Sequence, residues 1–350
     1  MAKDSIARPA TQESLLTRIK DNLPLVIVTV FSIILFIAVY IEGGTSQIFN
    51  VFITGGMWAL LAVGLALVFG VMNIPHFAHG ESFMVGAYVA FFTFTPMRDY
   101  LQQNPSPFLS AIAPFGAILI AGLAGAVLGV IIERMIFAPL RHRTQKGWVM
   151  NAFLLTVGIS FVLTNGANLV LGPNFRGVPR YWDIGAIEIL GAYMSADRLI
   201  ALGIALVSIG ALWFFLRQTR LGRAIRAVSQ DETGAQLVGI NLQFIHTLTF
   251  SLATAMAAIS GASLLFLFQA YPTVGGTPLY YAWYVVMMAG LGNVAGAIIG
   301  GFIVALLQTA TQMFVAVSWT TVIPTGVMIL VLLIAPSGLF GSEVKGVQEQ

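Results

Sequence analysis

The polar side chains best suited to specific chemistry gather in one segment, residues 217–241, of an otherwise apolar chain. Four arginines recur there at three-residue spacing, which keeps them near one helical face: Arg217, Arg220, Arg223 and Arg226. Guanidinium groups arranged in this way can bind an acidic protein surface or anionic lipid headgroups. Gly222 interrupts this helical pattern and predicts a bend there.

A second helix is predicted after the arginines. Ser229 followed by Glu232 matches a capping box, in which each side chain satisfies a free backbone N–H of the new helix. Gly239 stands where a residue in the left-handed conformation would end that helix. We therefore expect two short helices outside the membrane that dock a partner; the alternative is that the arginines only anchor the loop to lipid. The residues assigned to this docking loop are Arg220, Gly222, Arg223, Arg226, Ser229, Glu232, Gly239, Ile240 and Asn241.

A second polar group, His76, His79 and Glu81, raises the question of a metal site. Imidazoles three residues apart can share a helical face, but Pro75 and the single carboxylate make this a weak ligand set. We therefore predict no metal here, and expect His79 and Glu81 to tie the inner ends of two spans together through hydrogen bonds.

Two features inside the apolar runs are candidates for a transport path. Polar residues recur at roughly helical spacing in one run: Thr156, Ser160, Thr164, Asn165 and Asn168. This stripe either lines the path or bonds neighbouring helices, and both interpretations stay open. The second feature is a Gly-rich run, which predicts close helix packing at Gly296 and Gly300 and a helix break between Leu279 and Val294 that lines a cavity. The pathway candidates are His79, Glu81, Thr156, Ser160, Thr164, Asn165, Gly290, Gly292, Asn293 and Gly296.

The elements that carry these residues are membrane-spanning helices. The chain has 350 residues, of which 58% are hydrophobic and 9% charged, and it contains no cysteine, so disulfides and thiol chemistry are excluded. Its apolar runs are long enough to cross a bilayer, which takes about 20 residues. The fold class is an all-α polytopic membrane protein with nine or ten spans, one of them broken by glycines. The predicted spans are Leu23–Ile41, Ile48–Val71, Phe77–Thr95, Phe108–Ile132, Ala152–Gly172, Leu199–Leu216, Gln243–Phe268, Leu279–Val317 (long enough for two crossings) and Trp319–Ala335.

The basic residues orient these spans. With the N-terminus inside, 13 of the 17 Lys and Arg residues fall on inner segments, as the positive-inside rule requires. We therefore expect residues 1–22 to be a cytoplasmic segment, residues 23–341 a transmembrane domain with the docking loop in the cytoplasm, and residues 342–350 a C-terminal tail. From Thr233 to Ser342 there is no charged residue, so the rule does not decide the side of the C-terminus.

Two absences narrow the function. We find no charged residue near the middle of any predicted span, whereas ion-coupled carriers bury such residues on their pathway. The chain also lacks a Gly-x-x-x-x-Gly-Lys-Ser/Thr loop, so it has no P-loop of its own for ATP. If it pumps, another subunit supplies the energy, and the docking loop is the expected contact.

Four sequence motifs resemble those of a known family, the LivH-like permease subunits of branched-chain amino-acid ABC importers. They are Thr219–Ala227 running on to Leu237–Asn241, Phe77–Glu81 with Gly86–Tyr88, Glu133–Arg134 with Pro139–Arg141, and Gly290–Ala297 with Gly300–Gly301. Together they cover about residues 48–341. The chain departs from the family pattern at three positions, where the family commonly has Asn, Arg and Ser: His76, Ala138 and Asn293.

The resemblance implies a transport subunit of the bacterial inner membrane and not an enzyme. It implies half of a pore in the lipid bilayer, completed by a second homologous, LivM-like permease. Two cytoplasmic ATPases would use ATP and magnesium, a periplasmic binding protein would deliver substrate, and this chain would bind no cofactor and no nucleic acid. The implied substrate is a branched-chain or other neutral amino acid. The alternatives are an importer of urea or short amides, a stand-alone passive channel or a secondary carrier; a purely structural anchor fits poorly with a helix break and polar stripes.

Overall fold

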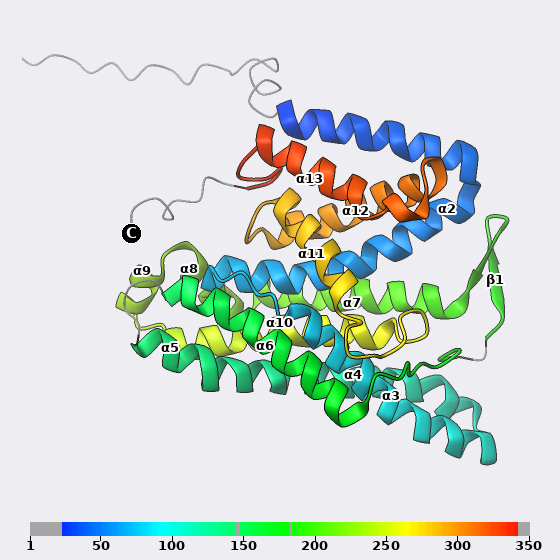
Figure 1. Ribbon diagram of the computed structural model, residues 1–350, viewed down its shortest axis with the longest axis horizontal. Coiled ribbons are helices and arrows are strands. Elements are labelled where there is room, and N and C mark those ends of the chain that lie inside the picture. The colour runs from blue at the N-terminus through cyan, green and yellow to red at the C-terminus, as the bar shows by residue number, and fades with distance from the viewer. Residues whose placement is uncertain (1–22, 144–147, 183, 342–350) are drawn as a thin grey trace, which may run out of the picture.

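The computed structural model describes residues 23–143, 148–182 and 184–341 (Figure 1). It confirms an all-α polytopic membrane protein: apart from one short hairpin, the regular elements are helices. The helices are α2 (Leu23–Met72), α3 (His79–Gln103), α4 (Pro107–Ile132), the π-helix η1 (Glu133–Phe137), α5 (Ala138–Arg143), α6 (Trp148–Leu171), α7 (Ala196–Gln218), α8 (Arg220–Gln230), α9 (Glu232–Leu237), α10 (Leu242–Ser263), α11 (Gly276–Ala289), α12 (Val294–Phe314), the 3-10 helix η2 (Val317–Trp319) and α13 (Val322–Ile334).

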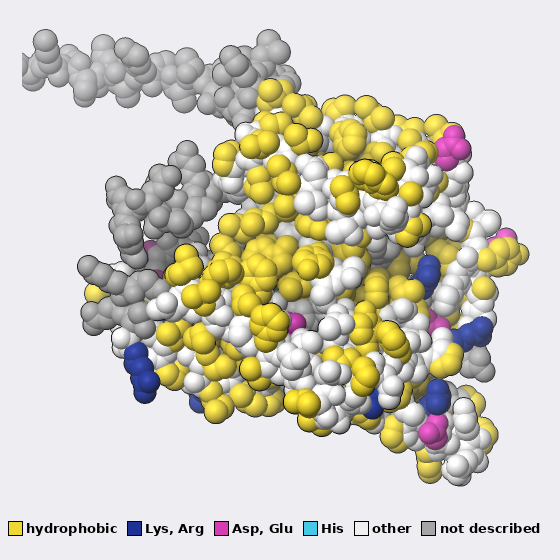
Figure 2. Space-filling view, in the orientation of Figure 1, with side chains coloured by type: hydrophobic (Ala, Val, Ile, Leu, Met, Phe, Trp, Pro, Cys, Tyr) yellow, Lys and Arg dark blue, Asp and Glu magenta, His cyan; other side chains and the backbone are white. Residues whose placement is uncertain are grey.

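Within the described residues, seven helical segments are long and apolar enough to cross a membrane, namely α2, α4 with its extension to Arg143, α6, α7, α10, α12 and η2 with α13. Hydrophobic side chains cover much of the face of the molecule that Figure 2 shows. Helix α2 holds the first two predicted spans, which are separated where Gly44 adopts a left-handed φ of 63°. Every other predicted span also overlaps a described helix. The Gly-broken stretch forms the short α11 followed by α12.

The second half of α2 forms the centre of the bundle. Residues 57–68 are buried, and α12, α10, α11 and α7 pack against this helix. Small residues allow close approach: a Cβ on Gly301 would lie 2.7 Å from Ala59 Cβ, and one on Gly64 would lie 2.7 Å from the Ala253 carbonyl oxygen. Such contacts drive helix association in a bilayer, where apolar burial alone gives little driving force.

The two ends of the bundle differ. In Figure 1, helices α5, α8 and α9 lie at the left end, together with the last described residues, whereas the hairpin lies at the right end. The excess of basic residues predicts that the left end is the inner one.

The hairpin pairs β1 (Ala186–Ile189) with β2 (Ala192–Ser195), in the register Ala186↔Ser195. Leu190 and Gly191 both have positive φ, as a tight two-residue hairpin turn requires. Sequence analysis did not predict this hairpin, because four-residue strands with a Leu-Gly turn give little signal against the surrounding apolar runs.

Candidate functional site

Helix α3 begins inside the fold and not at its inner surface. After α2 ends, residues 73–78 run back without helical structure, and Asn73 has a left-handed φ of 54°. His79, the first residue of α3, is buried with Nε2 3.1 Å from the Leu61 carbonyl oxygen, eleven residues before the end of α2. An extended segment covers about 3.3 Å per residue, so six residues suffice for this return.

Glu81, in the first turn of α3, bonds to the middle of another span. Its Oε1 accepts hydrogen bonds from Ser160 Oγ at 2.6 Å and from Thr164 Oγ1 at 3.3 Å. Ser160 lies halfway along the 24-residue α6. The predicted tie between two spans is confirmed, but its predicted place at their inner ends is wrong. The statement that no charged residue lies near the middle of a span is also wrong, because the chain returns through residues 73–78 before α3 starts.

The predicted polar stripe of α6 holds residues that bond to other segments and one that bonds only within α6. Thr156 is buried and accepts a hydrogen bond from Phe77 N at 3.2 Å, and it lies 3.2 Å from the Pro75 carbonyl oxygen. Together with Ser160 and Thr164 it fixes the returning segment and the start of α3 against α6. Asn165 instead bonds within its own helix, to the Phe161 carbonyl oxygen.

Aromatic rings line the space beside this polar contact. The Phe77 ring lies 5.4 Å from that of Phe153 and 5.2 Å from that of Trp283, so α6 and α11 meet across it. The Nε1 atom of Trp283 is buried and has no hydrogen-bond partner among the residues that the structure describes. His76 lies behind this layer, with its ring 4.7 Å from that of Phe250 and 5.6 Å from that of His79.

The start of α11 meets the start of α3. Gly275 and Gly80 are in backbone contact so close that neither could carry a Cβ without movement. Two helices therefore begin side by side within the bundle. Irregular backbone at this depth is tolerated only where it is buried in protein or lines a cavity.

The predicted helix break lies at Gly290–Asn293. Gly290 and Gly292 have φ of 104° and 80°. Asn293 caps α12: its Oδ1 accepts from Gly296 N at 2.8 Å, and its Nδ2 donates to the Phe340 carbonyl oxygen at 2.6 Å. Gly292 packs on Gly70, and Gly290 packs on residues 337–341. The break is therefore confirmed and joined by packing to the end of α2 and the end of the described chain; its part in a pathway stays a prediction.

The docking loop forms the two predicted helices, but with different start signals. Thr219 caps α8, accepting from Gly222 N at 2.9 Å. The predicted bend at Gly222 is wrong, because the chain turns at Thr219. Gly222 lies in the first turn of α8, against the backbone of Leu216, where a Cβ would not fit.

The predicted capping box is also wrong. Ser229 is still within α8, and its Oγ donates to the Arg226 carbonyl oxygen at 2.8 Å. Asp231 caps α9 instead, accepting from Gly234 N at 3.0 Å. An aspartate directly before the helix caps it as well as serine does, so the nearer residue takes the role. The predicted left-handed end is confirmed at Gly239, with φ of 85°.

The outer face of the docking loop is basic with an apolar tip. The four arginines are exposed, whereas Ile225 and Val228 pack inward. Leu237 and Val238, at the end of α9, are 83% and 77% exposed. Exposed apolar side chains outside the lipid-facing helices indicate a surface that a partner covers.

A buried network ties the docking loop to the spans. Glu133 has no exposed surface and accepts from Arg141 at 2.9 Å and from Thr247 Oγ1 at 2.6 Å. The preceding residue of α10, His246, has Nε2 3.6 Å from Glu232 Oε1 of α9. Burial raises the pKa of Glu232, and the positive charge of Arg141 opposes that rise. Sequence analysis quoted Glu133 and Arg141 only within a motif; a carboxylate at the end of an apolar span was the available signal for their pairing.

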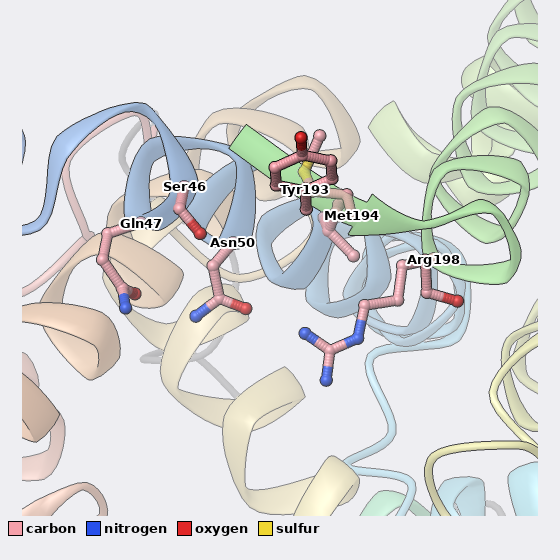
Figure 3. A pocket seen from close by; sticks show the side chains of 8 residues that line it. Ser46, Gln47, Asn50, Tyr193, Met194 and Arg198 are labelled. Atoms are coloured by element: carbon pink, nitrogen blue, oxygen red, sulfur yellow. The ribbon is translucent and has the colours of Figure 1, made fainter. Parts of the chain in front are cut away.

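A polar cavity opens at the other end of the bundle, between the break of α2 and the hairpin (Figure 3). It has a volume of about 380 Å³ and is lined by Ser46, Gln47, Asn50, Ile53, Tyr193, Met194, Ser195 and Arg198. The Arg198 side chain extends toward it from the start of α7. Sequence analysis did not predict this cavity, since α2 and the hairpin meet only in the folded chain.

Comparisons with known proteins agree with this architecture. A family model described as the permease component of the branched-chain amino acid transport system matches residues 47–332. The high-affinity branched-chain amino acid permease LivH of Salmonella typhimurium is 31% identical over 300 residues, which are 84% of this chain and 94% of that protein. BraD of Pseudomonas aeruginosa is 28% identical over 300 residues, with 84% and 95% covered. The ribose import permease RbsC of Escherichia coli is more distant, 26% identical over 298 residues. The chain belongs to the family of branched-chain amino acid transport permease components.

Proposed function

We propose that this chain is the membrane-spanning permease subunit of an ATP-driven importer of branched-chain amino acids. The observation that carries the proposal is the family match across residues 47–332, which includes the returning segment, the docking loop and the Gly-rich break. Relatives named as branched-chain amino acid permeases cover nearly the same residues.

The proposed complex contains three kinds of partner. A second homologous permease completes the pathway, two cytoplasmic ATPases bind and hydrolyse ATP with magnesium, and a periplasmic binding protein delivers the substrate. The exposed arginines and the apolar tip of the docking loop support an ATPase contact, because a guanidinium face beside apolar side chains is typical of protein interfaces. The N-terminus would lie in the cytoplasm and the hairpin on the outer side of the inner membrane.

The substrate is tested by uptake into cells that hold the complete importer. Leucine, isoleucine and valine should compete with one another, whereas urea and ribose should not. Competition by urea without competition by leucine would reject the proposal in favour of an amide importer.

The ATPase contact is tested separately by co-purification. Arg223→Glu reverses the charge at an exposed position of α8 and should weaken retention of the ATPases on the tagged permease. Arg98→Glu, at the opposite end of the bundle, is the matched control and should retain them fully. Equal retention by both variants would leave the docking loop as a lipid anchor.

A further inference from the structure

One carboxylate oxygen deep in the bundle lacks a partner. Glu81 Oε1 receives the hydroxyl groups of Ser160 and Thr164, but Oε2 is buried without a hydrogen bond among the described residues. Leaving a buried oxygen of this kind unsatisfied is costly, and an ionisable residue inside a membrane span indicates function.

Glu81 forms no ion pair with another described residue. The ion pairs formed by the described residues join Arg98 with Asp99 and Arg141 with Glu133, and neither includes Glu81. The neighbouring His79 directs Nε2 to the Leu61 carbonyl oxygen on α2, whereas Glu81 bonds to α6. The described residues hold no group of three or more metal-ligating side chains that would bring a metal ion here.

The Glu81 side chain lies near one face of the bundle, although Oε2 itself has no exposed surface in this conformation. Glu81 is only partly buried, and Phe77, at the end of the returning segment, is 37% exposed beside Phe153 and Trp283. A molecule that displaces the packing over Oε2 would therefore meet a hydrogen-bond acceptor and an aromatic wall together.

We propose that Glu81 Oε2 binds the α-ammonium group of an amino acid in transit, with its apolar side chain against Phe77 and Trp283. An ammonium group has three donors and no acceptor, so it satisfies the free oxygen and supplies the missing positive charge. A neutral sugar or amide supplies donors but no charge. This inference rests on the proposed function, and it names the substrate group that the permease itself recognises.

Protection of a single thiol tests the proposal directly. The chain contains no cysteine, so Thr164→Cys places one thiol beside Glu81 while Ser160 keeps its bond. In the purified complex, leucinol, which has the ammonium group but no carboxylate, should slow labelling by N-ethylmaleimide. The acid 2-hydroxy-4-methylpentanoate, which lacks the ammonium group, should not. Equal protection by both compounds, or by neither, would reject the ammonium site.

Glu81→Gln in the Thr164→Cys background removes the charge and leaves an acceptor for Ser160. It should raise the leucinol concentration for half-protection by about tenfold or more, equivalent to about 1.4 kcal/mol. Glu81→Asp, which keeps the charge, should retain part of the protection. If Glu81 only ties two helices together, the Glu81→Gln variant should need the same leucinol concentration for half-protection as its parent. That result overturns the proposal.

Two further measurements separate this idea from misfolding and from the proposed function. The melting temperature of each variant shows whether it is folded. If Glu81→Gln and Ser160→Ala lose equal stability, and leucinol protects the folded fraction of each variant as well as before, Glu81 has a packing role only. Leucine uptake by the unmodified complex is measured independently. Leucine uptake without leucinol protection would reject the ammonium site and keep the proposed function. Ammonium-specific protection without leucine uptake would keep the site and reject the proposed function.

Discussion

Glu133 and Arg141 form a charge pair that the inner end of the bundle depends on. Glu133 is fully buried, both of its oxygens are used, and Arg141 also lies over the Trp148 ring at 5.3 Å. When one partner of a buried pair is removed, the other keeps its charge without compensation. The pair therefore holds the η1–α5 segment against α10 only while it is complete.

Arg141→Ala should lower the free energy of unfolding by about 3–5 kcal/mol, because it leaves the Glu133 carboxylate buried alone. Removing both charges in Glu133→Gln/Arg141→Met should recover most of that loss. Thermal unfolding of the purified permease in detergent measures both effects. A single variant as stable as the unchanged chain would show that water already compensates Glu133.

Glu232 gives a pH dependence outside the membrane. Burial raises its pKa above the unfolded value, so folded and unfolded states bind protons differently between the two pKa values. The stability that comes from protonated Glu232 is fully present below the pKa of the unfolded state and is lost as pH rises through the pKa of the folded state. Glu232→Gln cannot lose a proton, so its melting temperature should exceed that of the unchanged chain at high pH, and the difference should shrink as pH falls from about 8 to about 4. A variant less stable at pH of about 8 would mean that attraction to Arg141 outweighs burial.

At the scale of elements, the docking loop is a rigid connection between α7 and α10. Gly239 N bonds to the Gln236 carbonyl oxygen and Ile240 N to that of Ala235, which closes the end of α9. Asn241 then caps α10, accepting from Phe244 N at 3.0 Å. A change in the conformation of Gly239 therefore reaches the start of α10 within two residues.

Gly239→Val forces a β-branched residue into a left-handed conformation at a cost of about 1–2 kcal/mol. No atom lies within 4 Å of the added Cβ, so the cost is conformational and not steric. We expect normal amounts of folded permease, with uptake lost and ATP hydrolysis no longer stimulated by the loaded binding protein. Gly239→Asn is the control, because asparagine tolerates this conformation, and it should transport. Normal uptake by Gly239→Val would show that the loop does not couple the ATPases to the spans.

At the scale of the whole molecule, the helices alternate between two ends. Ser46 lines the cavity beside the hairpin, and Gly177 packs against Gln269 near the isolated bridge between Arg176 and Ala270. The docking loop lies at the opposite end (Figure 1). A membrane between these ends gives each position a defined side.

Single cysteines test this arrangement. Cysteines at Ser46 and Gly177 should react with an impermeant thiol reagent in intact cells, whereas one at Gln230 should react only after the membrane is opened. Gln145 is expected to behave like Gln230, although it lies outside the described residues. Labelling at Gln230 from outside would invert the topology and place the docking loop away from any cytoplasmic ATPase.

Local features of the sequence alone determined the membrane helices and two of the backbone turns of this protein. Span length and hydropathy located the membrane helices, because a bilayer requires long apolar runs whatever their packing. Gly239 and the Gly290–Asn293 break followed from the backbone freedom of glycine, whereas the orientation inferred from the basic residues stays a prediction. The motifs were specific enough to indicate the permease family before any contact was known.

The tertiary structure decided which polar groups meet. Glu81 looked like an inner-end residue because α3 follows α2 closely in sequence, but the chain returns through residues 73–78 and brings its carboxylate to the middle of α6. Pairing between residues 79 positions apart leaves no periodic trace in a single sequence. The contact of Glu133 with Thr247 and the cavity between α2 and the hairpin could not be predicted for the same reason. Each depends on how segments distant in the sequence pack together, and residue spacing along one chain does not encode that packing.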